Sequence, residues 1–281
     1  MRGVGVVGGA ISLVNAVAAG RGATLGIELG TRAEIEVTEG GGTHVGSDTA
    51  SSRLARATIE RIVPERHIRR YGIRVSVSSE VPAGYGLKSS SAASTAVALA
   101  CSAVFGPYRD RRVLMAGVRA SIDSGVSITG ALDDACGCYY GGFNVTDNTA
   151  NRIARRDRAP RGLSAVIFVP RKRRRGRPKD LRRSPGPFAR AWGLARGASY
   201  WEAMNINGFA AAPALGSDPL IPARMLGAGA LGASVSGNGP AVAAVCRSTD
   251  VTRVRRALAG EDGSIIVSRV SNRAARSWTA R

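Results

Sequence analysis

The sequence predicts an α+β fold, in which strands and helices follow one another without the regular β-α-β alternation of a doubly wound sheet. Strand-like segments alternate apolar and polar residues, and helix-like segments place apolar residues three or four positions apart. The chain has 281 residues, of which 44% are hydrophobic. A chain of this length and composition can bury a sizeable core and form two domains of ordinary size or one large one.

The first half of the chain is expected to contain two strand regions and four helices. Residues 22–37 and 73–77 alternate as strands, with a Gly-rich turn over 39–48. The predicted helices cover residues 51–62, 89–105, 109–124 and 131–139. Gly106 and Pro107 end the second of these helices.

The second half begins with a short buried strand over 163–169, which Pro170 closes. A basic stretch then leads into a helical region that contains Trp192, Trp201 and Met204. The remaining elements are predicted as a strand at 241–246, a helix at 251–258 and a strand at 264–270. Composition shifts near 151–160, so we predict one domain at 1–155 and a second at 156–281.

The net charge of +20 is unevenly distributed along the chain. Residues 152–196 hold 14 Arg and 2 Lys against 2 Asp, which leaves 20 − 14 = +6 for the rest. The densest part is the basic segment 171–183. A protein that binds nucleic acid over its whole surface would be expected to spread its charge more widely.

Targeting and redox features are few. No apolar run reaches the ~20 residues that span a bilayer, so no membrane partner is expected. The N-terminal stretch lacks the uninterrupted apolar run and the cleavage site of a signal peptide. The four cysteines form no CxxC pair and the chain has only two histidines, which makes a zinc site improbable and favours a reducing cytoplasm.

The clearest chemical feature lies between the strand near 73–77 and the helix at 89–105. Gly84 and Gly86 allow backbone conformations and close approaches that a side chain would block. The unpaired N–H groups in the first turn of the next helix favour an anion, and Lys88 adds a positive charge. We predict a phosphate-binding loop formed by Pro82, Ala83, Gly84, Tyr85, Gly86, Leu87, Lys88, Ser89, Ser90, Ser91 and Ala92.

Two common phosphate motifs do not fit this loop. A Walker A loop requires contiguous Gly-Lys-Ser, and here Leu87 separates Gly86 from Lys88. A formal G-x-G-x-x-G begins at Gly3, where no strand has room to precede it, so we interpret it as chance. The alternative is that the loop has only a structural role, as a Gly-rich turn followed by a serine N-cap.

The loop resembles the central motif of the GHMP kinases, Pro-x-x-x-Gly-Leu-x-Ser-Ser-x-Ala. A lysine at the position of Lys88 resembles the motif of one branch of that family, the archaeal shikimate kinases. The segments 13–22 and 201–208 also resemble that branch. A third motif is similar at 232–240, although Asn238 departs from its usual threonine. The resemblance implies an N-terminal domain of the ribosomal protein S5 domain 2-like type and a ferredoxin-like C-terminal domain. It further implies that ATP also contacts Ser236, Gly237 and Gly239.

The resemblance also assigns roles to three carboxylates. GHMP kinases have an Asp seven residues before a closing glycine, and from Gly141 this position is Asp134. Asp134 is therefore the first candidate for orienting or deprotonating the acceptor hydroxyl, with Asp133 in reserve. The family's acidic Mg²⁺ ligand, eleven residues earlier, matches Asp123, and Ser90 would share the ion. The ordinary alternative for Asp133 and Asp134 is a favourable interaction with a helix N-terminus.

The implied activity is that of a phosphotransferase with an alcohol acceptor, converting shikimate and ATP to 3-phosphoshikimate and ADP on the route to chorismate and the aromatic amino acids. Arg21 could pair with the substrate carboxylate and Asn15 could bind a hydroxyl. A surface arginine and a turn-capping asparagine are the ordinary alternatives.

Other activities remain open at this level. Another GHMP kinase, acting on homoserine or mevalonate, is the nearest rival. A nucleic-acid-binding protein that uses 171–183 as a basic arm ranks lower, because the segment lacks interleaved aromatic residues. A homodimer is left open.

Overall fold

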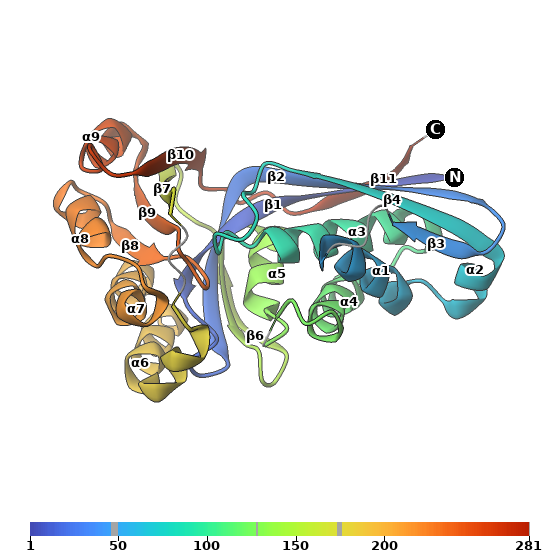
Figure 1. The fold of residues 1–281 in the computed structure, drawn as a ribbon, viewed down its shortest axis with the longest axis horizontal. Coiled ribbons are helices and arrows are strands. Elements are labelled where there is room, and N and C mark those ends of the chain that lie inside the picture. Colours follow the sequence, from blue (N-terminus) through green and yellow to red (C-terminus); the bar gives the residue numbers. More distant parts are fainter. Residues whose placement is uncertain (46–49, 128, 173–175, 281) are drawn as a thin grey trace.

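The computed structural model of the chain describes residues 1–45, 50–127, 129–172 and 176–280, and it contains two sheets with helices packed against them (Figure 1). The α+β class predicted from the sequence is confirmed. The predicted helices and strands are found with small shifts at their ends, and residues 22–37 belong to one long strand. Residues 46–49 of the predicted Gly-rich turn and residues 173–175 of the basic segment lie outside the described part.

The first sheet is built mainly from the N-terminal half of the chain. Its strand order is β11-β1-β2-β4-β3, β5 pairs with the beginning of β2, and β6 pairs with β5. The β3–β4 pair is parallel and the other pairs are antiparallel. The strands are β1 (Arg2–Val14), β2 (Arg21–Glu39), β3 (Gly42–Val45), β4 (Tyr71–Ser79), β5 (Phe143–Asp147), β6 (Arg152–Asp157) and β11 (Arg276–Ala280).

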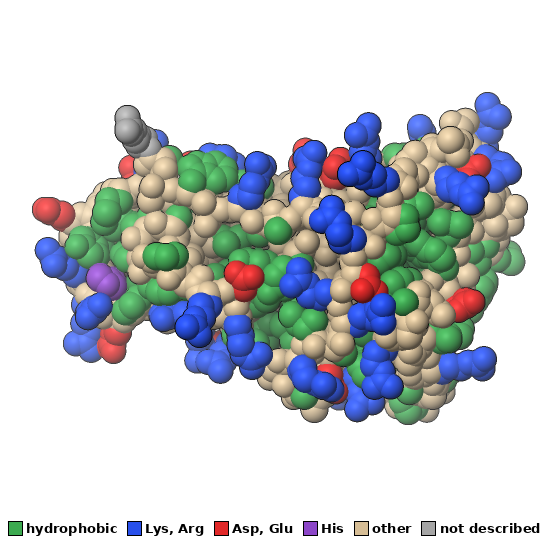
Figure 2. Space-filling view, turned by 180° about the vertical axis from the view of Figure 1, so that it is seen from behind, with side chains coloured by type: hydrophobic (Ala, Val, Ile, Leu, Met, Phe, Trp, Pro, Cys, Tyr) green, Lys and Arg blue, Asp and Glu red, His purple; other side chains and the backbone are tan. Residues whose placement is uncertain are grey.

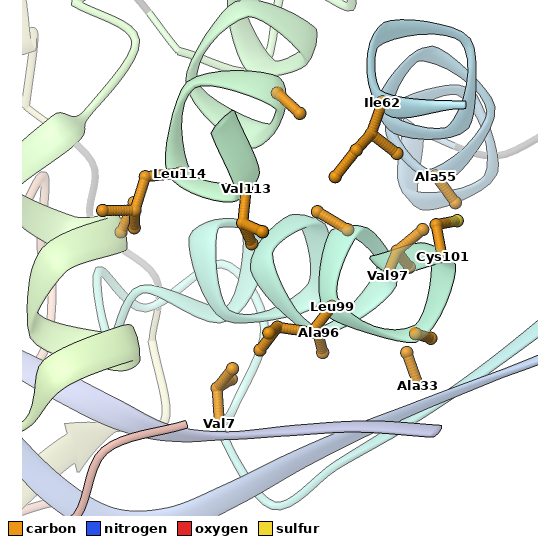
Figure 3. Packing of buried hydrophobic residues seen from close by; sticks show 14 of the residues in the cluster. Val7, Ala33, Ala55, Ile62, Ala96, Val97, Leu99, Cys101, Val113 and Leu114 are labelled. Atoms are coloured by element: carbon orange, nitrogen blue, oxygen red, sulfur yellow. The ribbon is translucent and has the colours of Figure 1, made fainter. Parts of the chain in front are cut away.

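Helices cover one face of this sheet, with α3 lying directly against it (Figure 1). Figure 3 shows Val7 and Ala33 of the sheet pointing toward α3, while Ile62 and Val113 approach α3 from its other side. This sandwiched position buries most residues of α3. The helix tolerates it because it consists mainly of small residues and has no distinct polar face. The helices are α1 (Ala50–Ile62), α2 (Glu65–Arg70), α3 (Ser89–Phe105), α4 (Asp110–Asp123) and α5 (Leu132–Tyr140).

Strand β1 was not predicted, and its glycines have a packing role. A Cβ on Gly3 would lie 2.4 Å from the carbonyl oxygen of Ala100, and one on Gly5 would lie 2.2 Å from that of Ala96. Both positions therefore require glycine so that the strand can approach the backbone of α3. The formal G-x-G-x-x-G is explained by this contact and has no nucleotide-binding role here.

The second sheet is four-stranded and antiparallel, in the order β10-β7-β9-β8. Its strands are β7 (Leu163–Pro170), β8 (Gly232–Val235), β9 (Val242–Arg247) and β10 (Gly263–Arg269). The accompanying helices are α6 (Pro185–Arg196), α7 (Tyr200–Leu215), α8 (Leu220–Gly227) and α9 (Val251–Arg256), with 3₁₀ turns η1 (Pro178–Arg183) and η2 (Ser248–Asp250).

The chain passes from the first sheet to the second between β6 and β7, but its last strand, β11, returns to pair with β1. The N- and C-termini therefore lie at the same end of the molecule (Figure 1). The division at 155/156 stays a prediction, and residues 276–280 of the predicted second domain complete the first sheet. Within the described residues, no helix is long and apolar enough to cross a membrane.

The core of the first sheet offers a test of the fold. Ile27 on β2 is fully buried, so Ile27→Ala should lower the free energy of unfolding by about 2–5 kcal/mol in urea denaturation followed by circular dichroism. Val77 on β4 is 42% exposed, so Val77→Thr keeps the β-branch and should change stability by less than about 0.5 kcal/mol. Equal effects of the two substitutions would contradict this packing.

Candidate active site

The predicted phosphate-binding loop packs against a second loop that follows β8. Gly86 has φ +80°, and a Cβ there would lie only 1.9 Å from the carbonyl oxygen of Ser236. The Ser236 hydroxyl also donates a hydrogen bond to the Gly86 carbonyl at 3.0 Å. Only glycine fits at Gly86, because both its φ angle and its contact exclude a side chain.

The end of β1 joins these two loops. The Ser12 N–H donates to the Ser236 hydroxyl at 3.2 Å, and the Gly237 N–H donates to the Ser12 hydroxyl at 2.9 Å. The Asn15 amide donates to the Gly237 carbonyl at 2.6 Å, while its oxygen accepts the N–H of Val17 at 2.8 Å. Three motifs that are far apart in sequence therefore meet at one place, and the Asn15 side chain serves to hold them together.

A cavity of about 460 Å³ lies where these segments meet. Its lining contains mostly small and polar residues, as expected for a site that accepts a phosphorylated ligand through backbone and hydroxyl groups. The lining residues are Ser12, Asn15, Ala16, Val17, Gly84, Gly86, Lys88, Ser89, Ser90, Ser91, Ser121, Val126, Ser127, Thr129, Ala131, Asp133, Asp134, Gly176, Pro178, Gly237, Asn238 and Gly239.

The first turn of α3 faces this cavity. Lys88 is its N-cap residue in the left-handed conformation, with φ +69°, and Ser89, Ser90 and Ser91 follow it along the cavity wall. The first N–H groups of a helix have no partner within the helix, so this turn can bind an anion. The remaining predicted ATP-binding residues shape the loop without lining the cavity: Pro82, Ala83, Tyr85, Leu87, Ala92 and Ser236.

A buried ion pair joins the phosphate-binding loop to α5. The Lys88 ammonium lies 2.9 Å from Oδ1 of Asp134, with side-chain exposures of only 4% and 17%. That Oδ1 atom is buried against the ammonium, while the Asp134 side chain also lines the cavity. A carboxylate has two acceptor oxygens, so Asp134 has acceptor capacity left for a ligand hydroxyl. Gly237 leaves room for the ammonium, since a Cβ there would lie 2.8 Å from it.

Asp133 lies behind Asp134 and is buried more deeply. Its Oδ1 accepts a hydrogen bond from the Asn148 amide at 2.7 Å, and its Oδ2 occupies space that a Cβ on Gly22 would fill, at 2.2 Å. Burial, followed by the charge of Asp134, raises the pKa of Asp133 to about 7, although Lys88 and Asn148 oppose the shift. Sequence reasoning missed Asn148, because it lies in a turn after β5 without a motif around it.

Asp123, which the sequence predicted as a Mg²⁺ ligand, lies outside the cavity lining. It is the last residue of α4, and its side chain is 39% exposed and does not line the cavity. Its Oδ2 forms an ion pair with the Arg61 guanidinium at 2.7 Å. The family spacing placed Asp123 correctly in sequence, but the end of α4 points it toward α1.

Arg21 also lies outside the cavity lining. Its guanidinium pairs with Asp147 on the neighbouring strand at 3.2 Å and packs over the ring of Trp192 at 4.9 Å. Successive side chains of a strand point to opposite faces, and here Gly22 faces Asp133. Arg21 is thereby directed away from the carboxylates of the cavity.

The lining offers oxygen ligands of the kind that Mg²⁺ prefers, in Ser90 and the neighbouring serines. Within the described ranges, no group of three or more His, Cys, Asp or Glu side chains gathers in a way that could hold a metal ion. A ligand can bring further oxygen ligands of this kind. A nucleotide triphosphate supplies such oxygens.

Comparisons with known proteins agree with these observations. The family model "GHMP kinases N terminal domain" matches residues 53–142, and "GHMP kinases C terminal" matches residues 222–264. The shikimate kinase of Methanosarcina acetivorans is 34% identical over 97% of this chain and 95% of its own length. The shikimate kinase of Pyrococcus abyssi is 35% identical over 87% of this chain and 92% of its own length.

Solved structures share the fold at lower identity. The homoserine kinase of Cytophaga hutchinsonii is 17% identical, with a TM-score of 0.74 over 98% of this chain and 97% of that one. The mevalonate kinase of Methanococcus jannaschii is 16% identical, with a TM-score of 0.74 over 96% of this chain and 98% of that one. The two-domain architecture implied by the sequence resemblance is therefore confirmed.

The raised pKa of Asp133 predicts how its contribution to stability depends on pH. The folded protein keeps this proton up to about pH 7, whereas the unfolded chain loses it near pH 4. The contribution is therefore present at pH 4 and is lost as pH rises to about 7. The stability of Asp133→Asn relative to the parent protein should accordingly increase between pH 4 and pH 7, measured by urea denaturation.

Asp147 provides the control, because its hydrogen bonds lower its pKa. Its contribution is lost only as pH falls through that lowered pKa, so the relative stability of Asp147→Asn should stay level between pH 5 and pH 7. A parallel pH dependence in both variants would argue against a special environment at Asp133.

Proposed function

We propose that this protein transfers the terminal phosphoryl group of ATP to a hydroxyl of shikimate. The chain belongs to the GHMP kinase family, and archaeal shikimate kinases are similar to it over nearly its whole length. The products are ADP and 3-phosphoshikimate. One observation carries this proposal: the ion pair of Lys88 and Asp134 lies in the same cavity as the exposed first turn of α3. A phosphate site and a carboxylate for the acceptor hydroxyl are thereby adjacent.

The phosphate half of the site relies on the backbone. N–H groups at the start of α3 and the hydroxyls of Ser89–Ser91 would bind the phosphate oxygens, and the glycines at 84, 86, 237 and 239 let the nucleotide approach the main chain. Lys88 would neutralise charge on the transferred group. Transfer through a loose transition state depends mainly on such positioning and charge neutralisation.

Asp134 would act on the acceptor. Its carboxylate, which lines the cavity, can accept a hydrogen bond from the attacking hydroxyl, which orients the oxygen toward the terminal phosphorus. The new bond forms between this oxygen and phosphorus, the bond from phosphorus to the leaving oxygen of ADP breaks, and the hydroxyl proton passes to the carboxylate. The Lys88 ammonium, 2.9 Å from Oδ1 of Asp134, would hold this carboxylate in place beside the phosphate site.

Mg²⁺ belongs to the proposal as the ion that accompanies ATP and neutralises its phosphate charge. Ser90 is the predicted metal residue that lines the cavity, so it would hold the ion together with phosphate oxygens and water. Asp123 takes no part.

Shikimate is preferred over homoserine and mevalonate because the relatives near 34% identity that span the chain are named shikimate kinases. The likeness to homoserine and mevalonate kinases is below 20% identity and concerns the fold. As part of the same proposal we place the reaction in the cytoplasm, where the four buried, unpaired cysteines would stay reduced. The homodimer stays a prediction. Light scattering would test it by measuring the molar mass of the protein in solution.

The proposed activity is tested with a coupled ADP-release assay on shikimate, homoserine and mevalonate. Turnover of shikimate is expected, and Asp134→Asn should lower kcat by roughly 10²–10⁴-fold, because the hydroxyl loses its acceptor. The matched control is Asp123→Asn, which should retain kcat within about threefold. Robust turnover of homoserine or mevalonate without shikimate would refute the substrate, and full activity of Asp134→Asn would refute the role of that residue.

The role of Ser90 is tested separately by titrating Mg²⁺ at fixed ATP. Ser90→Ala should raise the Mg²⁺ concentration needed for half-maximal activity, since one oxygen ligand is lost. Ser102→Ala, at the far end of α3, is the control and should leave that concentration unchanged. Identical Mg²⁺ curves for Ser90→Ala and the parent protein would exclude Ser90 as a ligand.

A further inference from the structure

Part of the basic segment borders the active-site cavity. Gly176 and Pro178 belong to the lining, although they are more than 80 residues from the phosphate-binding loop in sequence. This segment contains the highest density of positive charge in the chain, and the proposed reaction leaves that charge unexplained. We consider here only its described residues from 176 onward.

The described part of the segment is firmly attached to the second half of the molecule. The Gly176 N–H donates to the Leu215 carbonyl at 3.0 Å, and a Cβ on Gly176 would lie 2.0 Å from the Ala214 carbonyl oxygen. Five residues later, Leu181 is 2% exposed and packs in the same core cluster as Val17. Both anchors hold η1 at the rim of the cavity.

Arg182 follows the second anchor, is exposed and lies outside the cavity lining, but it contacts a residue of that lining. Its Nε donates to the carbonyl of Val17 at 3.2 Å, and Val17 itself lines the cavity. A guanidinium has five N–H donors in a planar fork, so one bond to Val17 leaves the others for a ligand. In the described part of the chain, Arg182 pairs with no carboxylate, whereas its neighbour Arg183 pairs with Asp180 at 3.3 Å.

The charges inside the cavity create a need for such a cation. Lys88 already pairs with Asp134, and Asp133 lies beside them. Arg21, which the sequence suggested for the substrate carboxylate, is paired with Asp147 outside the lining. Among the residues that the structure describes, an acceptor that carries a carboxylate would therefore find acidic side chains and no unpaired Lys or Arg in the cavity lining, so we look for a cation at the rim.

We propose that Arg182 binds the carboxylate of the acceptor, and that Arg177 and Lys179 add positive potential around it. Arg177 and Lys179 flank the cavity-lining Pro178, and both are exposed. The inference rests on the proposed function and specifies its substrate class: a small hydroxy acid that enters with its carboxylate toward η1 and its hydroxyl toward Asp134. A bidentate guanidinium–carboxylate pair gives both affinity and orientation.

A nucleic-acid partner for the same charge is less favoured by the surface. On the face of the molecule shown in Figure 2, acidic and apolar side chains lie between the Lys and Arg side chains, whereas a nucleic-acid-binding surface would present a continuous basic stripe. The test below includes this alternative as an outcome.

The experiment compares Arg182→Gln with Arg183→Gln in the full-length protein. Arg182→Gln should raise the KM for shikimate by about 10- to 100-fold, while the KM for ATP stays within about twofold, because only the carboxylate contact is lost. Arg183→Gln removes the adjacent charge from the same turn and should leave both KM values within about twofold. Arg182→Lys should fall between the parent protein and Arg182→Gln.

A neutral substrate separates this inference from the activity itself. The parent enzyme should prefer shikimate to its methyl ester, and Arg182→Gln should lose that preference. Turnover of shikimate with equal use of the ester would overturn the inference and leave the proposed function intact. If shikimate is not a substrate, the proposed function fails, and the same pair of variants is tested on the active acid and its ester. Equal shikimate KM values for Arg182→Gln and Arg183→Gln, with salt-sensitive DNA binding weakened by both, would favour the nucleic-acid alternative.

Discussion

The close contact between Gly86 and Ser236 is the constraint on which the site depends. It brings the loop before α3 against the loop after β8, although 150 residues separate them, and the hydroxyl of Ser12 completes the junction. Without a side chain at Gly86, two main chains can approach within hydrogen-bonding distance of each other. The cavity exists because these loops and the end of β1 are held together at this point.

The charges around the cavity form a consistent set. Two adjacent carboxylates, Asp133 and Asp134, would repel each other if both were ionised in a buried position. Lys88 forms an ion pair with Asp134, while burial and the charge of Asp134 raise the pKa of Asp133 against the opposing effects of Lys88 and Asn148. Asp134 is thus paired with a cation at the cavity wall, and Asp133 lies buried behind it.

Small residues serve packing as much as chemistry in this protein. Gly3 and Gly5 bring β1 against α3, and Gly22 makes room for Asp133. The helix α3 consists mostly of small residues and is enclosed by the sheet on one side and by α1 and α4 on the other (Figure 3). Its buried position fixes where its first turn meets the cavity.

The sequence by itself determined the α+β class and most helices and strands, because these follow from local periodicity. Its contiguous motifs also predicted the loop 82–92 and Asp134, which the structure places at one cavity. Spacing along the chain, however, does not give the direction in which a side chain points. Only the tertiary structure decided that Asp123 faces Arg61, that Arg21 lies on the opposite face of β2 from Gly22, and that the basic segment reaches the cavity. Those outcomes depend on strand alternation, helix ends and long-range packing, which join residues that are distant in sequence.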